Sequence, residues 1–115
     1  MRCVDLTRTA PALGEAEALR VQKLTGHLWA RLMELEEDGL RVLSPTDPKA
    51  GRGEVRVQFP AGEGRTAVQR LGERYGVRCT AGAQGDVCFA LGPDTTFEAL
   101  DYVQDAVYRY LLQSS

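Results

Sequence analysis

The stretch EVRVQF, residues 54–59, alternates strictly between polar and apolar side chains. Successive side chains of an extended strand point to opposite faces, so Val55, Val57 and Phe59 share one face and the polar residues share the other. Pro60 lacks the N–H that a strand ladder needs and ends the run. The pattern predicts a half-buried strand in a sheet that is covered on one face only.

Two more strands are predicted farther along the chain, at residues 77–81 and 87–91. The segment GAQG, residues 82–85, joins them and suits a hairpin connection. Alternation places Cys79 on the apolar face of the first strand, and it places Cys88 on the face opposite the apolar side chains of the second. We therefore expect the two thiols to point to different sides of the sheet.

Three helices and one further strand complete the expected elements. The long helix at residues 14–38 has apolar residues every three or four positions: Val21, Leu24, Leu28, Leu32 and Leu35. A short apolar run at residues 40–43 is a strand candidate, and residues 66–75 support a second helix. The last helix starts at Thr95, which forms a capping box with Glu98. The predicted order is helix, strand, strand, helix, strand, strand, helix.

This order predicts an α+β fold. Because each strand has one apolar and one polar face, we expect a two-layer sandwich with a mostly antiparallel four-stranded sheet and helices on one face. Residues 14–115 are predicted to form a single domain. Residues 1–13 lack an apolar run, and we expect them to be a flexible N-terminal segment.

Composition limits the classes of function. The chain has 115 residues and a net charge of -2, which argues against a nucleic-acid partner. No stretch approaches the ~18 apolar residues of a membrane span. Its three cysteines show no paired spacing, so we expect reduced thiols in a soluble, cytoplasmic protein with no membrane partner.

Three possible sites find weak support in the sequence. A metal or redox site needs converging ligands, but Cys79 and Cys88 are expected on opposite faces. The turn at residues 62–65 leads from a strand to a helix as a phosphate loop would, but Glu63 opposes an anion and a plain turn is favoured. His27, the single histidine, lies on the polar side of the first helix, where a solvated role is favoured. We therefore predict no catalytic, cofactor-binding or metal-binding residue.

The polar face of the sheet is the stronger candidate. Arg56, Arg78, Thr80 and Cys88 should project from it, beside Gln58 and Ala90, and form a mixed surface for a substrate or a docking domain. Ordinary solvent exposure explains the same pattern equally well. Cys88 would be a reactive thiol if it met a cation such as Arg78 or Arg56.

Four segments in order, LRVLSPTDP at 40–48, GEVRVQFP at 53–60, LGERYGVR at 71–78 and TTFEALDYV at 95–103, carry a family resemblance. Together they resemble the C-terminal small domain of class V aminotransferase-like, fold-type I enzymes. That family includes cysteine desulfurases, selenocysteine lyases and isopenicillin-epimerase-like proteins. The resemblance implies that the complete enzyme uses pyridoxal phosphate, held mainly by a larger domain with a Schiff-base lysine.

The sequence departs from this family at the positions that matter for chemistry. Cys88 stands where the resemblance implies an arginine that grips the substrate carboxylate, and Thr80 replaces a second arginine. The short turn at residues 83–85 replaces a mobile loop that carries a catalytic cysteine. Lys23 and Lys49 are the only lysines, and neither has the buried setting expected of a cofactor lysine.

The resemblance and these departures lead to one expectation and one alternative. The chain is expected to be a stand-alone or excised small domain, inactive alone, with no cofactor of its own and a large domain or homodimer partner. The alternative is a small α+β binding or homodimeric interaction module without catalysis. An independent enzyme has little support, because no acid, base and nucleophile set stands out.

Overall fold

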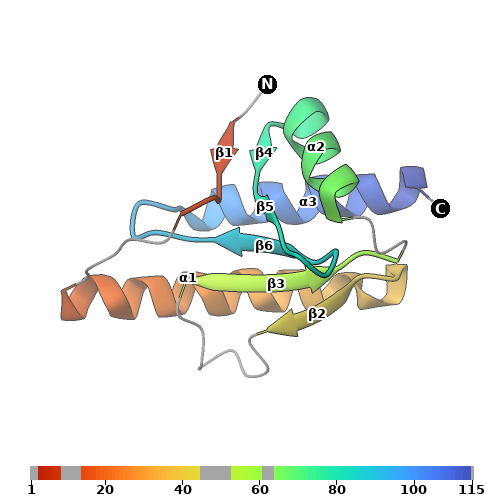
Figure 1. Ribbon diagram of the computed structural model, residues 1–115. Helices are drawn as coiled ribbons and strands as arrows, with labels where there is room; N and C mark the ends of the chain where they lie inside the picture. Colours follow the sequence, from red (N-terminus) through yellow and green to blue (C-terminus); the bar gives the residue numbers. More distant parts are fainter. Residues whose placement is uncertain (1–2, 9–13, 45–52, 61–63, 115) are drawn as a thin grey trace.

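The computed structural model describes residues 3–8, 14–44, 53–60 and 64–114 (Figure 1). Its elements, in chain order, are β1 (Val4–Asp5), α1 (Glu15–Met33), the 3-10 helix η1 (Glu34–Asp38), β2 (Arg41–Ser44), β3 (Glu54–Gln58), α2 (Gly64–Tyr75), β4 (Val77–Arg78), β5 (Thr80–Ala81), β6 (Val87–Ala90) and α3 (Phe97–Ser114).

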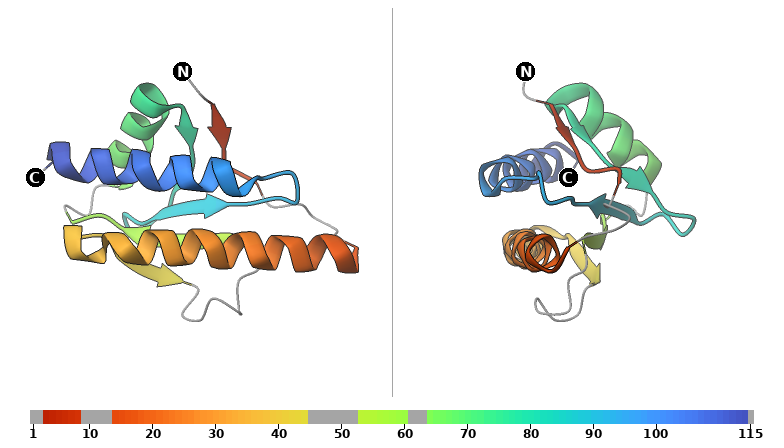
Figure 2. Two further views of the ribbon diagram at one scale, coloured as in Figure 1. Left: turned by 180° about the vertical axis from the view of Figure 1, so that it is seen from behind. Right: turned by 90° about the vertical axis from the view of Figure 1, so that its left-hand side faces the viewer.

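The sheet has the antiparallel strand order β2-β3-β6-β5, and β1 pairs in parallel with β4 beside it. α1 and α3 lie side by side over one face of this sheet, and α2 packs against β4, β5 and α3 (Figure 2). The four-stranded antiparallel sheet agrees with the α+β prediction. The predicted element order is wrong, because β1 precedes the first helix and the strand expected at 77–81 is divided at Cys79.

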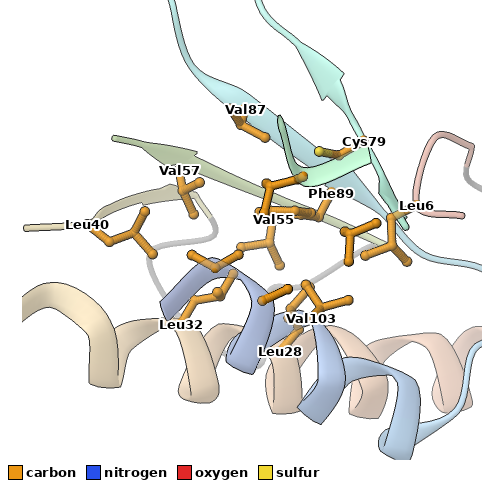
Figure 3. Close-up of a cluster of buried hydrophobic side chains, with 14 of the residues drawn as sticks. Leu6, Leu28, Leu32, Leu40, Val55, Val57, Cys79, Val87, Phe89 and Val103 are labelled. Atoms are coloured by element: carbon orange, nitrogen blue, oxygen red, sulfur yellow. The ribbon is translucent and has the colours of Figure 1, made fainter. Parts of the chain in front are cut away.

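The core lies between the sheet and the pair α1 and α3 (Figure 3). Val55, Val57 and Phe89 are fully buried there, against residues that include Leu28 and Val103. The alternation of β3 aims its valines at the helices, and the helical spacing of α1 and α3 aims their leucines and valines back. The face that the sequence predicted to be apolar is therefore the face that the helices cover.

Part of the N-terminal segment packs into the core, which the sequence did not predict. Residues 1–13 were expected to be flexible, yet Leu6 is fully buried and Val4 is buried in the same core. The Val4 N–H donates to Gly76 O at 2.8 Å, and the Leu6 N–H donates to Arg78 O at 2.7 Å. The partners of this segment come late in the chain, so local periodicity gives no sign of it. Residues 1–2 and 9–13 lie outside the described residues.

The helix ends agree in part with the sequence. Gly39 ends η1 with a φ of 103°, a left-handed conformation that favours glycine, so the helical segment ends where the predicted range 14–38 ends. The cap of α3 is Thr96 rather than Thr95, because Thr96 Oγ1 accepts from the Ala99 N–H at 3.1 Å. The Thr95 hydroxyl instead accepts from the Gly92 N–H at 3.2 Å.

Candidate docking face

The sheet face opposite α1 and α3 carries a row of four residues on neighbouring strands. The register pairs Ser44 with Arg56, Arg56 with Cys88, and Cys88 with Thr80. The structure thus brings together three of the four residues predicted for this face. Residues paired across strands point to the same side of a sheet, so alternation alone was enough to group them.

Arg56 is held by an ion pair that the sequence did not predict. Its Nη1 lies 3.0 Å from Asp86 Oδ2, and the Arg56 side chain is 45% exposed whereas that of Asp86 is 10% exposed. The hydrogen bond to Asp86 raises the pKa of Arg56, so the guanidinium stays charged. Asp86 was missed because it follows the hairpin turn, and its distance from Arg56 depends on a register that the sequence does not contain.

The same carboxylate lies against the hairpin turn. A Cβ on Gly82 would overlap the Asp86 carboxylate, and a Cβ on Gly64 would meet the carbonyl oxygens of Gly85 and Asp86. The Gly82 N–H also donates to Asp86 O at 2.8 Å. The turn is therefore closely packed between β3 and the start of α2, because two glycines allow the backbones to approach.

Cys88 is buried, although it lies on the polar face of the sheet. Cys88 is 8% exposed. The hydroxyl of its cross-strand neighbour Thr80 donates to Cys88 O at 3.5 Å. Burial is the main cause that raises the pKa of the Cys88 thiol; the Glu54 carboxylate raises it further, and Arg56 lowers it. The expected cation is thus present beside Cys88, but burial outweighs it and the thiol stays protonated.

Arg78 does not join this row. It lies on β4, where it pairs in register with Asp5 of β1. Its side chain borders a shallow hollow between β1, β4 and α2, lined by Thr7, Val68, Gln69, Gly72, Glu73, Arg78 and Cys79. The predicted set therefore divides into a row of Arg56, Cys88 and Thr80, and a separate position at Arg78. We use "docking face" below for the row together with Asp86.

Cys79 lies in the core, as its parity predicted, and Cys88 is outside that cluster. Burial raises the pKa of the Cys79 thiol to about 12. Both thiols and the exposed thiol of Cys3 are free. Within the described ranges, no three histidine, cysteine or acidic side chains converge to hold a metal ion.

His27 joins two helices rather than standing alone in solvent. Its Nε2 lies 2.8 Å from Asp101 Oδ1 on α3, and its ring meets Phe97 edge-on at 5.0 Å. Arg31 Nε lies 3.2 Å from the same carboxylate oxygen. The bond to His27 is the main cause that lowers the pKa of Asp101. This cluster connects α1 to α3 on the side away from the docking face.

The other sequence candidates add no site. Lys23 is exposed on α1, and Lys49 lies outside the described residues. Residues 61–63 of the turn weighed as a phosphate loop are also outside them, and α2 begins at Gly64. Over the parts of the chain that are described, no helix is long and apolar enough to cross a membrane.

Comparison with known proteins gives similarity at the level of structure. No family model matches the sequence, and no curated protein matches it significantly. A solved NifS-like protein superposes with a TM-score of 0.69 and 24% identity. The cystine C-S lyase C-DES, solved with its product cysteine persulfide, gives 0.71 and 19%. Alanine–glyoxylate aminotransferase from Nostoc sp. gives 0.63 and 26%.

The extent of these matches is uneven. They cover 84%, 85% and 81% of this chain, but only 28%, 25% and 25% of the NifS-like protein, the lyase and the aminotransferase. The chain thus spans about a quarter of the length of the proteins it resembles. The fold of this chain is therefore similar to one part of NifS-like and aminotransferase structures, with an extent consistent with a small domain.

Proposed function

We propose that this chain is a stand-alone or excised small domain of a class V aminotransferase or cysteine desulfurase-like enzyme. In this role it docks on a separate, cofactor-binding large domain and is inactive alone. The observation that carries the proposal is the unequal coverage, since most of this chain matches only about a quarter of each enzyme-like neighbour. The free thiols fit a reducing, cytoplasmic setting.

Within the described part of the chain, the residues do not fit a pyridoxal phosphate site. A lysine that forms an imine with this cofactor needs a desolvated pocket or a cationic neighbour to lower its pKa. Lys23 is exposed on the helix surface and is therefore solvated, and Lys49 lies outside the described residues. The large domain would therefore supply the cofactor and its chemistry.

The docking face suits contact with a protein surface better than capture of a small carboxylate. Arg56 already pairs with Asp86 through its Nη1, and the negative charge of that carboxylate beside the guanidinium disfavours a second carboxylate there. Thr80 is exposed and supplies a hydroxyl. Cys88, which lies between Arg56 and Thr80 in the row, is buried and projects little from the sheet. A partner would meet a low, polar surface with one oriented guanidinium.

A spectroscopic experiment tests the claim of inactivity. The chain is mixed with pyridoxal phosphate, passed through gel filtration and examined for an imine absorbance band. We expect no stoichiometric band to remain. A retained band that is lost on Lys23→Ala or Lys49→Ala would show that the chain holds the cofactor itself.

The alternative function is a homodimeric interaction module. It is favoured by the docking face, which no described helix covers (Figure 2). Light scattering on the isolated chain distinguishes the two. A stable dimer that Arg56→Glu disrupts, but that the matched variant Arg78→Glu leaves intact, supports the module. A monomer, or a dimer that Arg56→Glu leaves intact, supports the small domain.

A further inference from the structure

β1 and the residues after it fill a slot between β4 and β6. Leu6 hydrogen-bonds on both sides, since its N–H donates to Arg78 O at 2.7 Å and its carbonyl accepts from the Ala90 N–H at 2.9 Å. Thr7 then forms a parallel bridge with Ala90. β1 lies beside β4, at the other side of the molecule from α1 (Figure 1, Figure 2). The segment thus binds to strands from the other end of the sequence.

The slot also selects side chains. Val4 and Leu6 enter the core and are 7% and 0% exposed. Asp5 points outward in register with Arg78, and its Oδ1 accepts from the Thr7 N–H at 3.1 Å and from the Thr7 hydroxyl at 2.5 Å. The slot therefore requires apolar side chains at positions 4 and 6, whereas Asp5 and Thr7 bond to each other within the segment.

We propose that this slot is a strand-acceptor site, and that its second ligand is residues 4–7 of another copy of the chain. Two copies then exchange their β1 strands and form a dimer. Every backbone bond and buried side chain of the closed monomer is reproduced in the exchanged form, so concentration decides between them. The proposal does not rest on the proposed function.

The exchange is favoured because β1 is short. A strand of two residues opens at a lower cost than the whole fold. Once it opens, Gly76 O, Arg78 O and the Ala90 N–H lose their partners, and the cavity left by Leu6 is unfilled. The open edges of β4 and β6 can then pair with a matching strand, and a second copy of the chain supplies a strand with the same residues.

A disulfide trap tests the exchange directly. Asp5 and Arg78 are register partners, so Asp5→Cys and Arg78→Cys are combined in a Cys3→Ser background. The protein is refolded at about 10 μM and about 1 mM and then oxidised, and we expect the ratio of covalent dimer to cross-linked monomer to rise roughly in proportion to concentration. Cross-linked monomer alone at both concentrations overturns the proposal. So does a covalent dimer in which peptide mapping finds the two thiols at position 5 joined to each other and none joined to position 78.

A second measurement uses the unaltered chain. After refolding at high concentration, sedimentation velocity should show a dimer, and an excess of a synthetic peptide of residues 1–8 should convert it to monomer. The same peptide with Leu6→Asp should leave the dimer unchanged. An entirely monomeric chain, or a dimer that the native peptide does not dissociate, contradicts strand exchange.

Discussion

The two faces of the sheet are built from the same strands but are covered in different ways. On one face, Val55, Val57 and Phe89 are fully buried under α1 and α3. On the other, Cys88 and Ala90 are 8% and 5% exposed although no described helix lies above them. Their burial comes from the chain around them, with Arg56 beside Cys88 and the N-terminal segment beside Ala90.

The two faces should therefore contribute differently to the stability of the fold. The helix-covered face removes large apolar side chains from water, and that transfer is the main favourable term in folding. The docking face buries only small side chains beneath an ion pair, so changes there should cost less. We propose that this surface serves a partner.

The largest expected difference between the faces is in thiol reactivity. Cys79 is in the core and should react only when the domain opens, so its labelling by a maleimide should be roughly 10³-fold or more slower than that of exposed Cys3. Cys88 should react at an intermediate rate. Mass spectrometry of a labelling time course measures all three. Equal rates for Cys79 and Cys88 would contradict the contrast.

The same thiol predicts an alkaline loss of stability. The pKa of Cys79 is raised from 9.0 to about 12, so from pH 9 upward the unfolded chain loses this proton before the folded chain does. The folded state then binds more protons, and the free energy of unfolding should fall as pH rises through this range. Urea titrations at increasing pH measure it. Cys79→Ala should reduce the slope, whereas Cys3→Ser should not.

In the core, Phe89→Ala should lower the free energy of unfolding by about 3–5 kcal/mol, because it removes a fully buried ring and leaves a cavity. Cys88, the preceding residue on β6, points to the opposite face and provides the matched control. Cys88→Ala should lower the free energy of unfolding by about 1 kcal/mol or less. Urea unfolding of both variants gives the comparison. Similar losses would mean that the two faces do not differ in the way described.

The N-terminal segment gives a smaller but sharper test. Leu6→Ala should destabilise the domain by about 2–4 kcal/mol, since the side chain is fully buried. The exposed neighbour variant Asp5→Ala should change stability by about 0.5 kcal/mol. Thermal or urea unfolding suffices. If Leu6→Ala has no effect, residues 4–7 do not belong to the core.

The smallest effect is expected on the docking face. Arg56→Met leaves the Asp86 carboxylate, 10% exposed, without its guanidinium and should cost about 1–2 kcal/mol. It also removes the charge that lowers the pKa of Cys88, so labelling of that thiol should slow. Arg78→Met is the control and should change neither quantity. Loss of the effect at high salt would indicate a screened, purely surface pair.

The parts predicted well from sequence are those with a local signal. Alternation in residues 54–59 and 87–91 separates core from polar face, because side-chain direction depends only on adjacent residues. The row of Arg56, Cys88 and Thr80 follows from the same parity. Nothing local indicated that Cys88 would be buried, because burial is set by register neighbours.

The parts that sequence did not predict depend on distant pairing. Val4 and Leu6 are two apolar residues in a charged segment, and only β4 and β6 give them a place. The contact of Asp86 with Arg56 and the separation of Arg78 from the row depend on the sheet order. The structural comparisons support the fold resemblance, whereas docking and inactivity remain proposals with the tests given above.

The central claim, docking through the polar face, is tested most directly by amide hydrogen exchange on the full chain. The exchange is measured with and without the pyridoxal-phosphate-binding protein encoded nearest to this chain. We predict slower exchange at Arg56, Thr80 and Asp86 and unchanged exchange along α1. Protection on the α1 and α3 side, or no binding to that protein, would contradict the account.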